Sequence, residues 1–187
     1  MLKHAFTAAL LPALLLTGCS SNPEAEVTAG AQPLAATSFE NLDGWLADLP
    51  ARTTLTRDKA HTGNYSTMVG PGQDFSLGYM NALSRLSPEW PGQLTIGGWV
   101  LLPSEQAAAK LVTEVKGPTD KEPSLLWVGV DLAKAAKGFN KWQYVEQTIT
   151  LPATAKPDSR LLVYLWRADS KEPVYLDDLK ITLAGQK

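Results

Sequence analysis

An alternating apolar run closes the chain at residues 175–183, with the sequence YLDDLKITL. Side chains of a β-strand point alternately to its two faces. One face of this run takes Tyr175, Asp177, Leu179, Ile181 and Leu183. If that row faces the core, as we interpret it, Asp177 is a carboxylate in an apolar row, which must be hydrogen-bonded, ion-paired or bound to a metal. The run therefore predicts a closing β-strand with a fixed polar site near its entrance.

Short β-rich segments fill the rest of the domain. They are separated by Gly, Pro, Asn and Asp, which favour turns and end strands. The clearest predicted strands are 94–102, 110–116, 125–132, 142–151 and 160–167. A short helix is expected at 131–138, with Asp131 as its N-cap. Roughly eight to ten short strands predict an all-β protein, an antiparallel β-sandwich or jelly roll. An immunoglobulin-like sandwich is the alternative, although its Cys…Trp…Cys pattern is absent.

The N-terminus carries a second informative pattern. A positively charged segment, MLKH, is followed by an apolar run at residues 5–16 and then by Leu16-Thr17-Gly18-Cys19. The run is too short to span a bilayer comfortably as a helix. This order resembles a bacterial lipoprotein signal peptide with its lipobox. The resemblance implies cleavage before Cys19, lipidation of its thiol with palmitate among the acyl chains, and anchoring to a membrane.

The same resemblance divides the chain into three parts. Residues 1–18 are expected to be the signal peptide, 19–37 a flexible tether rich in small and polar residues, and 38–187 the β-sandwich domain. We expect a cell-envelope protein, on the outer membrane if the organism has one, because Ser20 rather than Asp follows the cysteine. Cys19 is the only cysteine, so the domain has no disulfide.

Composition argues against two function classes. The net charge is −2 and the sequence has no basic stripe, so nucleic acid is not an expected partner. His61 is the only histidine left after cleavage, and no spacing singles out a pair of acidic residues for glycoside hydrolysis. We therefore do not expect an enzyme.

Three separated stretches carry a family resemblance. They are Ser38-Phe39-Glu40 with Gly44-Trp45 after it, residues 60–66 with the sequence AHTGNYS, and residues 174–179 with the sequence VYLDDL. Their order resembles the carbohydrate-binding-module jelly rolls of the galactose-binding-like superfamily, especially families four, nine and twenty-two. The resemblance spans about residues 38 to 183.

In that superfamily the three stretches often converge on a structural calcium ion. The resemblance therefore implies Glu40 and Asp177 as side-chain ligands, with Asn64 as a contributor from the intervening loop. Calcium takes oxygen ligands from carboxylates and carbonyls, so the residue types agree. The alternative left open is that Asp177 pairs with Arg57, with Lys59 or with a backbone amide.

The candidate ligand surface follows from alternation in the strand 160–167. Leu161, Val163 and Leu165 form the presumed core row, so Tyr164 and Trp166 point to the other face, followed by Arg167. Trp127 alternates in the same way against its neighbours. Aromatic rings bind the apolar faces of sugars, and a glycan or polysaccharide is the predicted ligand. The alternatives are that the rings fill the core, that the domain holds a protein partner, or that it is a small hydrolase.

Overall fold

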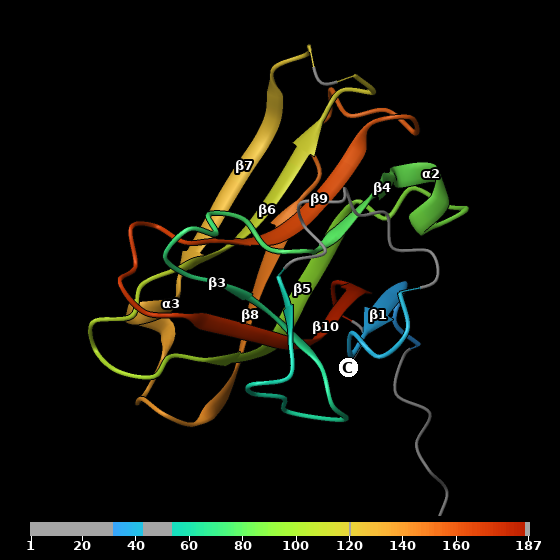
Figure 1. Cartoon of the computed structure of the whole chain (residues 1–187). Coiled ribbons are helices and arrows are strands. Elements are labelled where there is room, and N and C mark those ends of the chain that lie inside the picture. Colours follow the sequence, from blue (N-terminus) through green and yellow to red (C-terminus); the bar gives the residue numbers. More distant parts are fainter. Residues whose placement is uncertain (1–31, 43–53, 120, 186–187) are drawn as a thin grey trace, which may run out of the picture.

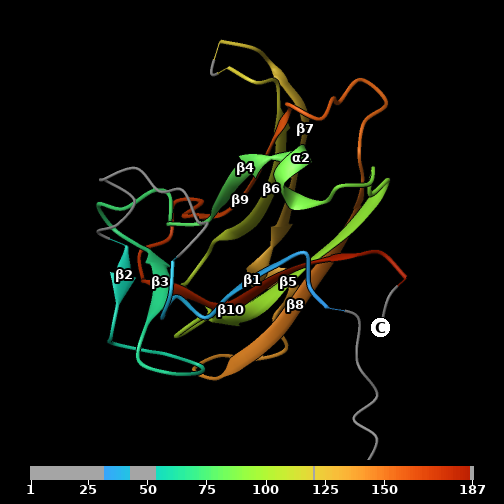
Figure 2. The ribbon, with the colours of Figure 1, turned by 90° about the vertical axis from the view of Figure 1, so that its right-hand side faces the viewer.

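Two antiparallel β-sheets stack face to face in the computed structural model, which describes residues 32–42, 54–119 and 121–185 (Figure 1, Figure 2). The larger sheet has the strand order β2-β3-β10-β5-β8, with β1 pairing along β10. The smaller sheet has the order β4-β9-β6-β7. The predicted all-β sandwich of the jelly-roll type is confirmed. The signal peptide, the lipobox and most of the tether lie outside the described residues.

The strand bounds are close to those predicted from alternation. The larger sheet contains β1 (Ala35–Thr37), β2 (Leu55–Thr56), β3 (Ser66–Val69), β5 (Gln93–Leu101), β8 (Trp142–Thr150) and β10 (Val174–Leu183). The smaller sheet contains β4 (Tyr79–Ala82), β6 (Lys110–Lys116), β7 (Ser124–Asp131) and β9 (Arg160–Trp166).

Two helices of one turn each, α2 (Leu83–Leu86) and α3 (Leu132–Ala135), connect strands. The Asp131 side chain accepts a hydrogen bond from the Lys134 amide at 3.3 Å, which confirms it as the N-cap of α3. Neither of these helices has the length and apolar character that crossing a bilayer would require.

The sandwich begins earlier than the expected tether boundary at residue 37. Ala35 pairs with Ile181 and Thr37 with Leu179, so β1 already belongs to the larger sheet. The Leu34 amide also donates to the Ile181 carbonyl at 2.8 Å. Small residues such as these give no clear hydrophobic alternation in the sequence, although Leu34 and Ala35 pack against the core in the paired strand.

The closing strand β10 contains a β-bulge that corrects its predicted core row. Its pairing with β5 shifts register between Asp177 and Lys180, and Asp178 has a φ of 46°. One extra residue therefore separates two phases of alternation. The core row is Val174, Leu176, Leu179 and Ile181, all fully buried in the hydrophobic core. Tyr175 and Asp177 belong to the opposite face, so the predicted row was wrong in its first half.

A glycine accommodates this bulge. Gly98 in β5 lies opposite it, where a Cβ atom would approach Leu176 Cδ1 to 2.8 Å. A side chain at this position would require the Leu176 side chain to shift within the core. The bulge in one strand and the glycine in its neighbour are therefore a matched pair.

A polar side chain of β8 contacts β6 across the core. Gln147 of β8 donates from Nε2 to Thr113 Oγ1 of β6 at 2.7 Å, and Thr113 is fully buried. The same Nε2 also approaches the Leu111 carbonyl at 3.5 Å. Loss of the nearer acceptor is costly, because the buried amide cannot replace it with water. The contact therefore fixes how the two sheets align.

We expect Thr113→Val, which preserves shape but removes the acceptor, to lower the free energy of unfolding by about 1–2 kcal/mol. Adding Gln147→Leu should restore part of this loss, since no buried amide then lacks a partner. Urea unfolding followed by tryptophan fluorescence measures both values. Equal midpoints for wild type and Thr113→Val would contradict the role given to this contact.

Candidate functional site: an aromatic face and a carboxylate clasp

The outer surface of the smaller sheet carries a group of rings that we call the aromatic face. Tyr164 and Trp166 project from β9 away from the buried row Leu161, Val163 and Leu165. Trp127 of β7 is 45% exposed, and Phe75, which bridges to Trp166, is 53% exposed. Three residues predicted to bind ligand, Tyr164, Trp166 and Trp127, are thus brought onto one surface.

The rings form two edge-to-face pairs. Trp127 and Trp166 have centroids 6.1 Å apart at an interplanar angle of 76°. Phe75 and Tyr164 have centroids 5.8 Å apart at 73°. Beneath them Val112 of β6, paired with Tyr164, is fully buried although it is on the outer side of the sheet. Each ring therefore packs against a neighbouring ring, and Val112 fills the space beneath them. These contacts limit rotation of the rings.

Gly129 explains how Trp127 reaches Trp166. Trp127 pairs with Glu114 of β6, whereas Trp166 pairs with Lys110, which lies four residues away along the same strand. The indole covers this distance by lying along β7 over Gly129, where a Cβ atom would stand 2.9 Å from Trp127 Cη2. The glycine thus allows the large ring to lie flat on the sheet, with one side exposed.

Polar groups lie among the rings. The Tyr164 hydroxyl donates to Glu114 Oε2 at 3.2 Å. Burial, followed by the charge of Glu114, raises the pKa of Tyr164 to about 12, so its phenol stays protonated at neutral pH. The Lys110 ammonium lies 5.8 Å from the Trp127 ring centroid and 5.5 Å from that of Trp166. The face therefore combines flat apolar surfaces with hydrogen-bonding groups of both kinds.

A small cavity continues the face at the Trp166 end. Its volume is about 300 Å³, and its lining residues include Lys110, Asp131, Trp166 and Asp169. A cavity of this size is at the lower end of the range for small-molecule sites. It extends the aromatic surface by a polar recess.

Arg167 does not lie open on this face. Its Nε donates to Asp74 Oδ1 at 2.7 Å and its guanidinium also donates to the Ser170 carbonyl at 3.2 Å. These bonds direct the guanidinium to the loop that carries Phe75. The sequence reasoning missed Phe75, Lys110 and Glu114, because only the strand order shows that their segments flank β9.

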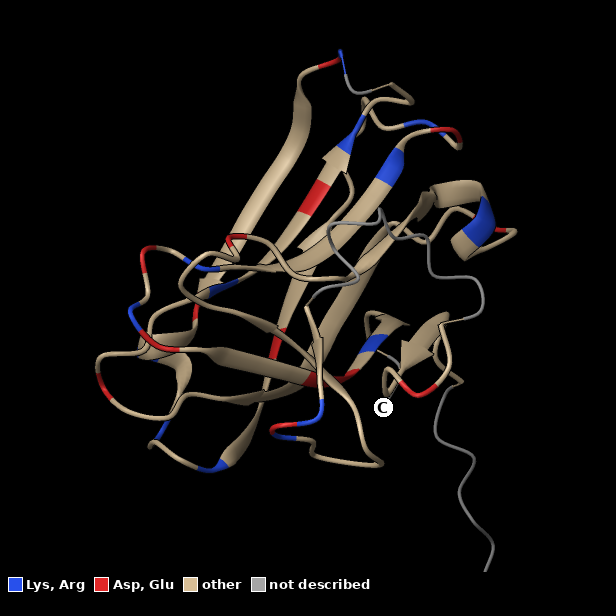
Figure 3. Ribbon diagram, in the orientation of Figure 1, with Lys and Arg blue, Asp and Glu red and all other residues tan. Residues whose placement is uncertain are grey.

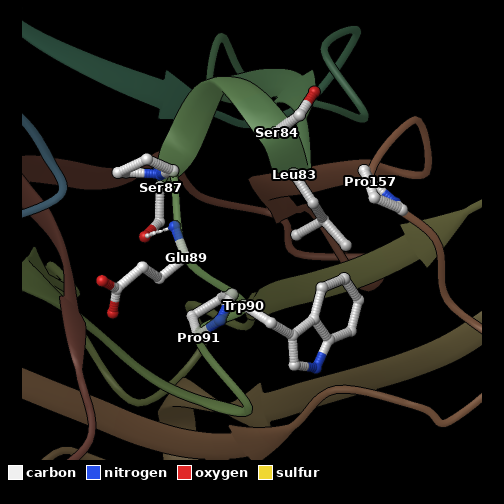
Figure 4. Close-up of a pocket in the computed structure, with 8 residues that line it drawn as sticks. Leu83, Ser84, Ser87, Glu89, Trp90, Pro91 and Pro157 are labelled. Carbon is white, nitrogen blue, oxygen red and sulfur yellow. Dashed lines mark hydrogen bonds between the residues drawn. The ribbon is translucent and has the colours of Figure 1, made fainter.

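A second exposed tryptophan lies apart from the aromatic face. Trp90, 49% exposed, lines a cavity of about 140 Å³ (Figure 4). Its indole lies near Leu83 and Pro157, and Ser84 points away from it. The lining of the cavity also includes Ser84, Ser87 and Glu89, and it contains a single aromatic ring rather than the pairs of rings found on the aromatic face.

The residues predicted to hold calcium form a different arrangement, which we call the clasp. Glu40 Oε1 accepts hydrogen bonds from the amides of Asn64 at 2.7 Å and Tyr65 at 2.6 Å. The hydrogen bond from the Asn64 amide lowers the pKa of Glu40, burial opposes this, and the hydrogen bond from the Tyr65 amide lowers the pKa further. Asn64 thus contributes an N–H group rather than an oxygen.

Asp177 is held in the same way from the other end of the chain. Its Oδ2 accepts from the amides of His61 at 2.7 Å and Thr62 at 3.1 Å, and its Oδ1 accepts from the Asp178 amide at 2.7 Å. Asp177 is fully buried. Burial raises its pKa, and the amide bonds oppose that rise. Of the three alternatives for Asp177, namely Arg57, Lys59 or a backbone amide, the structure shows hydrogen bonds from backbone amides.

This donor arrangement fits calcium poorly. Amide hydrogens carry partial positive charge, and they are bonded to Glu40 Oε1 and to both carboxylate oxygens of Asp177, which would have to face a cation. Within residues 32–42, 54–119 and 121–185, no group of three His, Cys, Asp or Glu side chains is placed to hold a metal ion. Calcium binding stays a prediction, and the hydrogen bonds of the clasp give it no support.

Comparison with known proteins places the fold. No family model matches the chain, and no curated protein matches it. Among solved structures, the chain resembles the CBM22-1 xylan-binding domain of Paenibacillus barcinonensis Xyn10C, with 21% identity and a TM-score of 0.54 over 84% of this chain and 98% of that one. A family 16 carbohydrate-binding module matches with 14% identity and a TM-score of 0.52, over 78% and 95%.

A third neighbour is the C-terminal family 22 module of Clostridium thermocellum Xyn10B, whose cleft binds ligand. It shares 18% identity at a TM-score of 0.54, over 83% of this chain and 96% of that one. The expected resemblance to carbohydrate-binding-module jelly rolls is confirmed at the level of the fold.

We expect Asp177→Ala to lower the free energy of unfolding by about 2–3 kcal/mol, because three amides lose their acceptor. For a domain of this size that lowers Tm by roughly 4–12 °C. Asp177→Asn, which keeps one carbonyl oxygen, is the matched control and should lose less.

Chelation tests the calcium prediction in the same assay. If hydrogen bonds alone hold the clasp, EDTA leaves the Tm of the wild type unchanged. A lower Tm in EDTA that added calcium restores, and that Asp177→Ala no longer shows, would establish an ion in the clasp.

Proposed function

We propose that the protein is a lipid-anchored, non-catalytic glycan-binding protein of the cell envelope and that the aromatic face holds its polysaccharide. The observation that carries this proposal is the pairing of Trp127 with Trp166 and of Phe75 with Tyr164 on one outer surface. Pyranose rings present apolar faces that stack on such side chains, and their hydroxyls require nearby donors and acceptors. Lys110 and Glu114 supply these.

The dimensions favour a chain over a single sugar. Phe75 precedes β4, and Trp127 is on β7, at the other edge of the smaller sheet. Three strand intervals of about 4.8 Å separate these positions, which gives roughly 14 Å across the sheet. A polysaccharide lying across the strands would meet a ring at each end of this distance. The polar recess beside Trp166 would accept a substituent or the continuing chain.

Xylan is the first polysaccharide to test, because neighbours such as the CBM22-1 domain of Xyn10C are named as xylan-binding domains. A hydrolase is less favoured, since Glu114, the carboxylate beside Tyr164, is already hydrogen-bonded to that side chain. Acidic and basic residues are dispersed over loops and strands rather than gathered in one patch (Figure 3). This distribution suits a neutral ligand better than nucleic acid.

We expect Trp127→Ala and Trp166→Ala each to weaken retention on insoluble xylan by about tenfold or more, which corresponds to roughly 1.4 kcal/mol. Trp90→Ala is the matched control, because it removes an indole of similar exposure from a different cavity. Depletion assays with the full chain in detergent measure the retained fraction.

Equal retention of all three tryptophan variants would count against the aromatic face as the binding surface. If neither xylan nor other insoluble polysaccharides retain the wild type, the glycan proposal fails. The alternative, a structural lipoprotein that binds a protein partner, would then be preferred.

Anchoring has its own test at Cys19, the cysteine of the lipobox-like segment. In a bacterial host, the wild type should be labelled by palmitate and sediment with membranes. Cys19→Ala should lose the label and remain with the soluble fraction, because acyl chains supply the membrane affinity. Unlabelled wild-type protein in the soluble fraction would overturn the anchoring proposal.

A further inference from the structure

The outer surface of the larger sheet carries a second ordered group of side chains, which we call the ladder face. Four neighbouring pairs of β5 and β8 share this surface: Trp99 with Tyr144, Gly97 with Glu146, Thr95 with Thr148, and Gln93 with Thr150. The surface is on the opposite side of the sandwich from the aromatic face, because the core separates the two sheets (Figure 2).

Tyr144 lies flat on this face for the same reason that Trp127 lies flat on the other. Its hydroxyl is directly above Gly97, where a Cβ atom would come within 2.1 Å of it. The Tyr144 residue remains 44% exposed. A glycine thus supports a large exposed ring on each of the two outer surfaces.

The Tyr144 ring is fixed from behind by a chain of contacts. Trp99 meets it edge to face, with centroids 5.8 Å apart. His61 stacks on Trp99 at 4.0 Å and 14°, and its Nδ1 is 2.6 Å from Asp178 Oδ2. The bulge in β10 therefore holds His61, His61 holds Trp99, and Trp99 supports Tyr144.

The rest of the ladder face is polar and has little charge. Thr95 and Thr148 share a hydrogen bond of 3.0 Å between their hydroxyls, and Gln93 donates to Thr150 Oγ1 at 3.0 Å. Glu146 is exposed, and the described part of the chain gives its carboxylate no ion-pair partner. A protein partner would find almost no apolar surface to bury beyond the aromatic end. A row of hydroxyl, amide and carboxylate groups next to a flat ring matches a neutral sugar chain.

We propose that the ladder face is a second glycan-binding surface, which makes the protein bivalent. The inference rests on the proposed function only for the class of ligand. With sites on opposite sides of one sandwich, a single copy joins two polysaccharide chains or two segments of one chain. Linked sites also raise the apparent affinity for a polymer above that of either site.

Titration calorimetry of the lipidated full chain with xylohexaose tests this proposal. We expect two sites in the wild type, one in Tyr144→Ala, one in Trp127→Ala and none in the double variant. Tyr144→Phe is the matched control, because it keeps the ring and should keep both sites. Wild type should also precipitate soluble xylan, whereas either single alanine variant should not. Tyr144 is exposed, so its truncation should leave Tm within a few degrees of wild type.

The two proposals fail in different ways. A single site that Trp127→Ala abolishes and Tyr144→Ala leaves intact would overturn the ladder face alone. A single site that depends on Tyr144 and not on Trp127 would overturn the aromatic face alone. Absence of any xylohexaose binding would overturn both for this class of glycan.

Discussion

The β-bulge at Asp177 and Asp178 is the constraint on which the rest of the structure depends. One extra residue in β10 lets Leu176 and Leu179 both enter the core, although they are three residues apart. It also leaves both carboxylates on the outer side, where they bind the loop that contains His61. Asp tolerates the positive φ that this geometry requires better than most residues do. A single irregularity thus joins the core to the clasp.

The two sequential glycines of β5 serve different partners. Gly98 faces inward and makes room for the bulge, whereas Gly97 faces outward and makes room for Tyr144. Their positions show that the GG pair is more than a flexible point in the strand. The pairing of β5 with β10 therefore affects two features. It sets the packing of Leu176 in the core, and it positions Gly97, over which Tyr144 lies.

Alternation predicted those parts of the fold in which strands are regular. The bounds of β6 agree with the prediction, and the row Leu161, Val163 and Leu165 is buried as expected. In β10 the same rule failed, because a two-residue period carries no sign of an inserted residue. The position of Phe75 could not be foreseen either, since it depends on which strands become neighbours. Alternation assigns Tyr144 to the same face as Glu146 and Thr148, but it could not predict that the ring lies over Gly97, because that glycine is on another strand.

The symmetry between the two outer surfaces is a stronger guide to function than either surface alone. A ring that lies over a glycine requires the right residue at each of two positions. Trp127 and Gly129 are on the same strand, whereas Tyr144 and Gly97 are on neighbouring strands. An exposed aromatic side chain gains no core packing from such a match, so folding alone does not require it. A flat, fixed and accessible ring is what a sugar ring needs for stacking. The repetition of this arrangement on both sheets therefore favours a protein that binds glycan on two sides over one with a single binding face.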